Sequence, residues 1–149
     1  MEPKYDSLTL KNQLCFPIYL CAKEVVRKYT PLLKKLDLTY TQYVVMMYFW
    51  EKRTSNVKKI SKTLLIDSST LTPLLKKLEK KGLVERAKDK EDGRNLMISI
   101  TEKGLGLREK ALVIPEKIGK CLGLSREEAE AFYMILYKIL MNTKRREIS

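Results

Sequence analysis

The apolar positions between residues 57 and 81 repeat with the period of two short amphipathic helices. In the first helix, over 57–64, the apolar side chains fall on one face. In the second, over 70–81, leucines recur at helical spacing, and Gly82 follows directly as a C-terminal stop. Between the two helices, Asp67 or Ser68 is the expected N-cap. The leucines of the second helix are Leu71, Leu74, Leu75 and Leu78.

The next two apolar runs, 83–86 and 96–100, alternate as strands do. The segment between them is polar throughout, and its Asp92-Gly93 dipeptide is a typical hairpin turn. Helix, turn, helix and hairpin in this order predict a winged helix-turn-helix, whose most frequent use is the reading of duplex DNA.

The segment before this region is also helical. Residues 8–36 are rich in helix-forming patterns, which Pro17 and Pro31 are expected to interrupt. A further helix opens at Thr39 and ends near Lys52.

Helices are predicted after the hairpin as well. One begins at about residue 102, capped by Thr101, and breaks near Ile114 because Pro115 follows. The last helix, over 127–141, begins at a capping box formed by Ser125 and Glu128.

The fold is therefore expected to be mainly α with a small β-hairpin wing, in one domain over residues 1–149. Residues 39–101 form the winged helix-turn-helix lobe, and 8–36 and 102–143 are dimerisation helices. In such a homodimer the two recognition helices would lie roughly 34–36 Å apart, one turn of DNA. The dimer would then read a pseudo-palindromic operator.

Charge and composition narrow the function. The chain of 149 residues has a formal net charge of +12 and no histidine. So basic a chain favours a nucleic-acid partner, with a lysine-rich solvated surface as the alternative. Without histidine, the usual nucleophile pairs and imidazole metal ligands are missing, and no glycine-rich phosphate loop is present. We expect no enzyme, no metal and no cofactor.

The amino terminus has no signal-peptide pattern, and the longest apolar run, 43–50, is too short to cross a bilayer. We therefore expect a cytoplasmic protein with no membrane partner. In that compartment its three cysteines do not form a structural disulfide framework.

The side chains expected to meet DNA lie along the second helix. Hydroxyl groups at its amino end can contact bases or phosphates, or they can simply cap the helix. Lysine side chains further along the helix are suited to bind the phosphate groups of DNA. The candidates are Ser68, Ser69, Thr70, Thr72, Lys76 and Lys77.

Arg94 follows the hairpin turn. An arginine at a wing tip can enter the narrow minor groove, and Asp92 can orient it by a charge-assisted hydrogen bond. From the residues alone, an exposed charge run at a hairpin tip is the alternative.

Residues 67–84, the tripeptide Asp92-Gly93-Arg94 and residues 98–104 together resemble the MarR family of dimeric winged-helix regulators. That resemblance implies that Arg94 and Asp92 contact DNA. Residues 10–16, with Tyr19, Tyr29 and Tyr40, are similar to the OhrR branch, repressors that sense organic hydroperoxide. This implies that oxidation of Cys15 by organic hydroperoxide releases the operator, and that the three tyrosines are hydroxyl partners of Cys15.

The physical chemistry is consistent with this resemblance, because a thiolate reacts with peroxide and phenol O–H groups can stabilise it. Tyr19 is four residues after Cys15, on the same helical face. Tyr29 is 14 residues away, about 21 Å along a continuous helix, so we infer that Tyr29, and with it Tyr40, reaches Cys15 across the dimer interface. The alternative is that Cys15 is a small hydrophobe and the tyrosines are packing residues.

The resemblance leaves two outcomes for oxidised Cys15: a disulfide with a second cysteine of the other subunit, or capping by a small thiol. Cys121 lies about where the two-cysteine type carries its resolving residue, so we expect an intersubunit Cys15–Cys121 disulfide. Cys21 falls on a different helical face from Cys15 and is assigned to packing. Because Pro17 sits in the sensor helix, that helix either starts late or is kinked beside Cys15.

Three functions remain open. The first is a peroxide-responsive repressor. The second is a MarR-type regulator that binds a phenolic or lipophilic ligand between the lobe and the dimerisation helices, with Cys15 inert. The third is a thiol peroxidase, which gives no reason for a basic wing.

Overall fold

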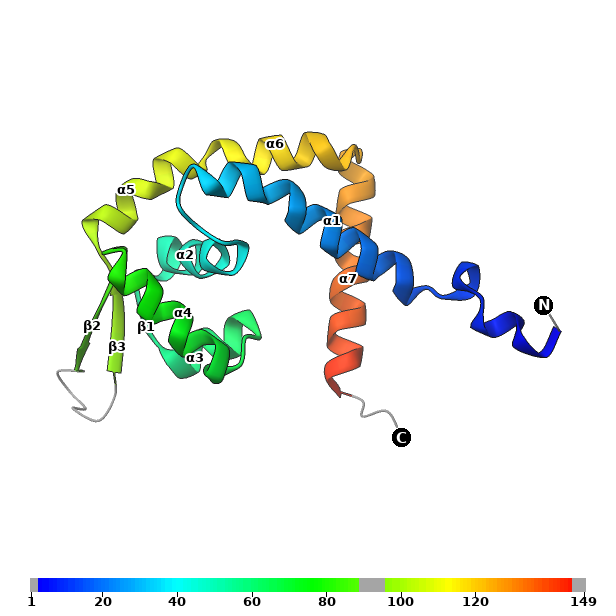
Figure 1. The fold of residues 1–149 in the computed structure, drawn as a ribbon, viewed down its shortest axis with the longest axis horizontal. Helices are drawn as coiled ribbons and strands as arrows, with labels where there is room; N and C mark the ends of the chain where they lie inside the picture. The colour runs from blue at the N-terminus through cyan, green and yellow to red at the C-terminus, as the bar shows by residue number, and fades with distance from the viewer. Residues whose placement is uncertain (1–2, 89–95, 146–149) are drawn as a thin grey trace. The chain divides into compact units, whose positions relative to one another are not determined.

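The structure, a computed structural model, describes residues 3–88 and 96–145 and is mainly helical with one small sheet (Figure 1). The backbone contacts divide the chain into two compact units, Met1–Ile114 and Pro115–Ser149. A mainly α fold with a small β wing is therefore confirmed.

The amino-terminal part consists of two short 3-10 turns, η1 (Pro3–Leu8) and η2 (Leu10–Asn12), followed by the long helix α1 (Cys15–Lys34). Of the two interpretations of Pro17, the late start is confirmed. Pro17 is the third residue of α1, where a backbone N–H has no partner within the helix, so its absence costs no hydrogen bond. The prediction that Pro31 interrupts the helix is wrong, because α1 continues to Lys34.

Helix α2 (Tyr40–Lys52) begins with a reciprocal capping box. The Gln42 backbone N–H donates to Thr39 Oγ1 at 3.3 Å, and the Thr39 N–H donates to Gln42 Oε1 at 3.1 Å. The predicted opening at Thr39 and end at Lys52 are confirmed.

Helices α3 (Val57–Leu64) and α4 (Ser68–Lys80) form the predicted helix-turn-helix. The bounds of α3 match the prediction, and α4 starts two residues earlier than expected. Asp67 is the N-cap of α4, but its side chain makes no capping hydrogen bond. Its backbone carbonyl instead accepts the N–H groups of Thr70 and Leu71, at 3.0 and 2.8 Å.

The end of α4 is a Schellman turn at Gly82. This glycine has a φ of +72°, which favours glycine over residues with a side chain. The Gly82 N–H donates to the Glu79 carbonyl at 2.8 Å, and the Leu83 N–H donates to the Leu78 carbonyl at 3.0 Å. The predicted stop is confirmed.

Three antiparallel strands follow the order β1-β3-β2: β1 (Thr54–Asn56), β3 (Leu96–Ile100) and β2 (Val84–Lys88). The hairpin strands β2 and β3 were predicted to within two residues. Strand β1 was not, because its three polar residues have no strand pattern and pair only once β3 is in place. The expected turn at Asp92-Gly93 lies outside the described residues.

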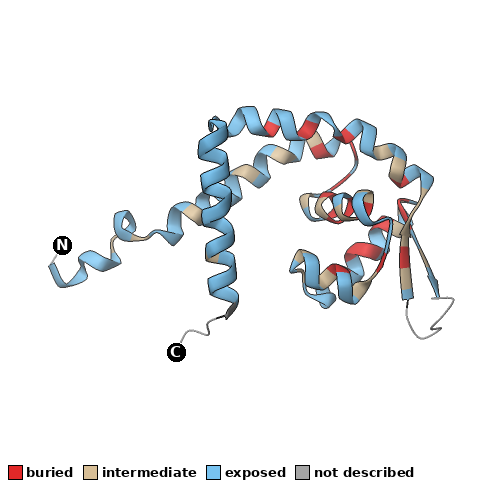
Figure 2. Ribbon diagram, turned by 180° about the vertical axis from the view of Figure 1, so that it is seen from behind, coloured by how far each residue is buried: buried red, intermediate tan, exposed pale blue. Residues whose placement is uncertain are grey.

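The core of the first unit is formed by α2, α3, α4 and the sheet, whose buried residues are red in Figure 2. Each of these elements contributes at least one side chain that is no more than 1% exposed. They are Val45, Met46, Phe49, Ile60, Leu71, Leu75, Leu78, Val84 and Ile98.

Helix α5 (Glu102–Ala111) is capped by Thr101, whose Oγ1 accepts the Gly104 N–H at 3.1 Å. The chain then breaks at Leu112, as predicted near Ile114, and continues as α6 (Val113–Leu122). The last helix, α7 (Arg126–Arg145), begins at the predicted capping box and extends beyond the predicted residue 141.

Among residues 3–88 and 96–145, no helix has the length and hydropathy that crossing a membrane requires. In the same described residues, no group of three or more His, Cys, Asp or Glu side chains is placed to hold a metal ion.

Candidate nucleic-acid interface and thiol site

Helix α4 has one buried side and one exposed side. Leu71, Leu74, Leu75 and Leu78 point into the core, and the polar residues between them face solvent. The six predicted DNA contacts of this helix are all exposed: Ser68, Ser69, Thr70, Thr72, Lys76 and Lys77. The hydroxyl groups lie at the amino end of α4 and the lysines in its second half, an arrangement that suits bases and phosphates respectively.

Helix α3 adds basic side chains that the sequence interpretation did not single out. Lys58, Lys59 and Lys62 are exposed on this helix, which packs against α4 through Ile60. The signal was present in the sequence, since lysines fill the polar positions of an amphipathic pattern. In a helix-turn-helix the first helix crosses the DNA backbone, where lysines bind phosphate.

The wing is fastened to α4 by an ion pair. Arg86 Nε, on β2, donates to Glu79 Oε2 at 2.8 Å, and a second guanidinium nitrogen of Arg86 contacts the same oxygen. The hydrogen bond from Arg86 lowers the pKa of Glu79 below its ordinary value. The predicted DNA contacts Asp92 and Arg94 lie outside the described residues.

Cys15 is the first residue of α1 and is exposed, and the neighbouring Leu14 is 73% exposed. Neither residue is part of a core within its own chain. The packing interpretation of Cys15 therefore has no support within the single chain.

The three predicted hydroxyl partners of Cys15 lie in two separate parts of the chain's structure. Tyr19 is exposed, one helical turn after Cys15. Tyr29 and Tyr40 lie together, with ring centroids 4.9 Å apart, and Tyr43 lies 5.9 Å from Tyr29. Burial, and then the neighbouring tyrosines, raise the pKa of Tyr29, so its phenol keeps its proton as a hydrogen-bond donor.

Because α1 is continuous from Cys15 to Lys34, Tyr29 lies about 21 Å along the axis from Cys15 of the same chain. The structure thus brings Tyr29 and Tyr40 to each other and keeps Tyr29 from its own Cys15. Cys21, assigned to packing, is exposed in the single chain, and so is Cys121 on α6. All three cysteines are free thiols.

Sequence comparison identifies the family. Residues 27–110 match the family described as transcriptional regulator SarA/Rot. The organic hydroperoxide resistance transcriptional regulator of Bacillus subtilis (strain 168) is 47% identical over 130 residues, which cover 87% of this chain and 86% of the relative. This chain belongs to the MarR-type winged-helix transcriptional regulators. A second relative of this MarR-type regulator, SarZ of Staphylococcus aureus (strain USA300), is 45% identical over 80% of this chain and 81% of its own.

Solved structures agree with this assignment. Reduced AbfR bound to DNA is 32% identical to the MarR-type regulator described here, with a TM-score of 0.77, covering 94% of this chain and 98% of that one. The S. aureus MepR–DNA complex is 27% identical, with a TM-score of 0.79, covering 87% and 98%. The named relatives are transcriptional regulators, and this chain is likewise a regulator and not an enzyme.

Proposed function

We propose that this MarR-type regulator is a homodimeric, DNA-binding repressor that releases its operator when organic hydroperoxide oxidises Cys15. The observation that carries the proposal is the exposed Cys15 thiol at the first position of α1, in a chain 47% identical to an organic hydroperoxide resistance regulator. As a partner of chromosomal DNA, the protein acts in the cytoplasm.

The DNA partner is double-stranded and pseudo-palindromic. The exposed side of α4 supplies hydroxyl and lysine side chains, and the net charge of +12 favours a polyanion. AbfR and MepR, which share the fold, are bound to DNA in their structures. Ser69, Thr70 and Thr72 are proposed to read base edges, and Lys76 and Lys77 to bind phosphates. Arg94 is proposed to enter the minor groove, and Asp92 is proposed to orient it by a charge-assisted hydrogen bond.

The homodimer is supported by exposed apolar surface on the long helices. Helix α7 is amphipathic in pattern, yet its large apolar side chains are exposed in the single chain, and Figure 2 shows the helix almost wholly in pale blue. So many exposed apolar side chains on one helix are typical of an interface. The residues concerned are Phe132, Tyr133, Met134, Ile135, Leu136, Tyr137, Leu140 and Met141.

The chemistry of sensing starts from the Cys15 thiolate. Its sulfur attacks the terminal oxygen of the hydroperoxide and the O–O bond breaks, which gives sulfenic acid and, after uptake of a proton, the alcohol. Sulfur is oxidised by two electrons and the peroxide is reduced by two. Tyr19 of the same chain and the Tyr29–Tyr40 pair of the other subunit are proposed to donate hydrogen bonds to the thiolate.

The sulfenic acid is proposed to condense with Cys121 of the other subunit, forming the Cys15–Cys121 disulfide and releasing water. Peroxide treatment should then give covalent dimers on a non-reducing gel. The Cys121→Ser variant should give none, since it has no resolving thiol. Peroxide-dependent covalent dimers of Cys121→Ser would overturn this pairing, and mass spectrometry of a small-thiol adduct would support the one-cysteine route.

The proposal is tested by fluorescence anisotropy with the labelled promoter duplex from upstream of the regulator's own gene. The reduced protein is titrated first, then the protein after one equivalent of cumene hydroperoxide, and then the same sample after dithiothreitol. We expect tight binding, release and rescue in that order. The Cys15→Ser control should bind and should not respond to peroxide.

A second candidate function is release by a non-covalent phenolic or lipophilic ligand. It is favoured by an open pocket of about 360 Å³ that is lined by apolar side chains, by the hydroxyl-bearing Thr30, Thr39 and Tyr40, and by the charged Lys34, Asp37 and Lys81. That volume is in the range of small-molecule sites. Release of Cys15→Ser from the duplex by a simple phenol, together with indifference of the wild type to peroxide, would select this function.

A further inference from the structure

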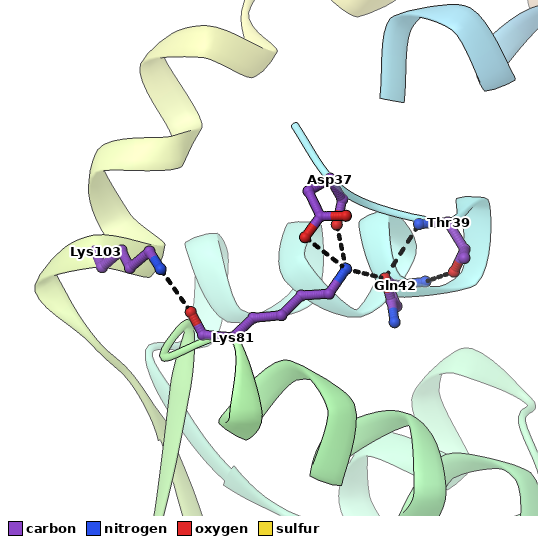
Figure 3. A network of polar contacts seen from close by, with 5 residues as sticks. All are labelled: Asp37, Thr39, Gln42, Lys81 and Lys103. Atoms are coloured by element: carbon purple, nitrogen blue, oxygen red, sulfur yellow. Dashed lines mark hydrogen bonds and ion pairs between the residues drawn. The ribbon is translucent and has the colours of Figure 1, made fainter. Parts of the chain in front are cut away.

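Lys81, whose side chain is half-buried, contacts three parts of the first unit through its ammonium group and its backbone carbonyl. Lys81 is the C-cap of α4, and its ammonium group donates to the backbone carbonyl of Asp37 (Figure 3). The same nitrogen lies 3.2 Å from Asp37 Oδ2 and 3.3 Å from Gln42 Oε1. Lys103 Nζ, from α5, donates to the Lys81 carbonyl at 2.7 Å. One residue therefore connects the end of α4 with α5 and with the junction between α1 and α2.

Further hydrogen bonds fix Gln42 and Asp37, the residues that the Lys81 ammonium group contacts. Gln42 is buried, and its amide oxygen also accepts the Thr39 N–H of the α2 capping box. Asp37 has a φ of +53°, an uncommon conformation for a residue with a side chain, and it follows the last turn of α1. The Leu38 N–H donates to the Leu33 carbonyl at 3.1 Å, which fixes this turn against the end of α1. A displacement of α1 along its axis is thus carried to Asp37.

Lys81 lies at the opposite end of α4 from the proposed DNA-reading hydroxyl groups. The proposed DNA-reading hydroxyl groups begin at Ser68, and α4 spans 13 residues, about 20 Å. A rotation of about 10° around the Lys81 end would move the Ser68 end by roughly 3 Å, a full hydrogen-bond length. A rotation of this size would displace the proposed base-reading hydroxyl groups of Ser69 and Thr70 from base edges.

The contact contributes little to stability. The side chain of Asp37 is 87% exposed and that of Lys81 is 29% exposed, and an ion pair with so exposed a partner stabilises a fold only slightly. Removal of the ammonium group also leaves Gln42 Oε1 with the Thr39 N–H as a partner. The network is therefore better suited to fix an orientation than to hold the lobe together.

We propose that Lys81 is a positioning residue that sets the orientation of α4 against the α1–α2 junction and transmits oxidation at Cys15 to the DNA-reading side of α4. This inference rests on the proposed function, since it assigns the route by which α1 controls DNA affinity. The route is a two-state contact, Lys81 bound to Asp37 or released from it.

The test compares Lys81→Met, Asp37→Asn, the double variant and Lys35→Met as full-length proteins. Methionine keeps the length of the lysine stem, and asparagine tolerates the positive φ of Asp37. Lys35 is an exposed lysine of the same region, and its side chain makes no hydrogen bond or ion pair within the described residues, so it controls for charge. The readouts are the ratio of Kd after cumene hydroperoxide to Kd before it, and the preference for the natural half-site spacing over a spacing one base pair longer.

Lys81→Met should lower the Kd ratio by about fivefold or more and flatten the spacing preference, while Lys35→Met keeps the wild-type values. Asp37→Asn should have a smaller effect in the same direction, because it removes the carboxylate charge and keeps the backbone carbonyl that accepts from Lys81. The double variant should match Lys81→Met, because the ammonium group that contacts Asp37 is already absent. The Tm should fall by less than about 4 °C. A stabilising role alone would lower the Tm and leave the spacing preference unchanged.

Wild-type values of both readouts in Lys81→Met would overturn the inference and leave the proposed function intact. If peroxide does not release the wild-type protein, the redox function fails, and the spacing preference by itself decides the positioning role. If the wild-type protein binds none of the duplexes, the proposed function and this inference fail together.

Discussion

Gly104 lies where the backbone of α5 passes close to the backbone of Leu83. A Cβ at this position would lie 2.2 Å from the Leu83 carbonyl oxygen and 2.8 Å from Ile100 Cγ1. The Gly104 carbonyl also accepts the Trp50 indole N–H at 2.9 Å. This residue lets α5 start directly against the turn that ends the recognition helix α4.

Gly104→Ala is expected to destabilise the protein by about 1–3 kcal/mol, because the backbone of Leu83 must move to admit a methyl group. Thermal unfolding followed by circular dichroism measures the effect. The matched control is Gly106→Ala on the same helix, where nothing lies within 4 Å of an added Cβ. Alanine there should raise stability by about 0.5–1 kcal/mol, so equal effects of the two substitutions would contradict the steric explanation.

At the scale of elements, the Glu79–Arg86 ion pair joins the recognition helix α4 to strand β2 of the wing. Arg86 lowers the pKa of Glu79 by hydrogen bonding, so the folded state binds the proton of Glu79 less readily than the unfolded state does. The stabilisation is therefore present above the ordinary glutamate pKa of 4.5 and is lost as the pH falls through the lower folded pKa.

Glu79→Gln should consequently lower the Tm at neutral pH, and the difference from wild type should shrink as the pH is lowered below the ordinary glutamate pKa. Melting curves across this range check the prediction. Glu116→Gln, which removes an exposed pair with Lys120 within α6, serves as the control and should have little effect at any pH. A Glu79→Gln difference that stays constant with pH would show that packing, not the ion pair, is responsible.

At the scale of the whole molecule, the proposed sensor site requires one subunit or the other to supply the tyrosines proposed as partners of Cys15. Within one chain, α1 separates Cys15 from Tyr29 along a continuous helix, while Tyr29 and Tyr40 lie 4.9 Å apart. A thiol site shared between subunits would couple oxidation directly to the dimer interface. That coupling is what a change in the spacing of two DNA-reading lobes requires.

Mixed dimers distinguish the two arrangements. One protomer carries Cys15→Ser and the other carries Tyr29→Phe with Tyr40→Phe. If the site is shared, the remaining Cys15 meets intact tyrosines of the partner chain and forms sulfenic acid at the wild-type rate per thiol, measured by dimedone labelling. A rate as slow as that of the Tyr29→Phe, Tyr40→Phe homodimer would place the tyrosines beside Cys15 of their own chain.

The local elements of this protein were determined by its sequence, because their signals are local. The leucine spacing of α4, the Gly82 stop, the Thr39 cap and the Ser125–Glu128 capping box each act over one or two helical turns, and the structure confirms all four. The family was also evident from the sequence, since its motifs are short and continuous.

Strand β1, the continuity of α1 and the contacts of Lys81 were decided by tertiary structure alone, because contacts between distant residues leave no periodic pattern in the sequence. Strand β1 exists only because β3 offers it a partner, and α1 runs through Pro31 where a local rule expected a break. The contacts of Lys81 with Asp37 and Gln42, 44 and 39 residues away, follow from the packing of three helices. A lysine in a basic chain carries no sign of this role until the fold supplies its partners.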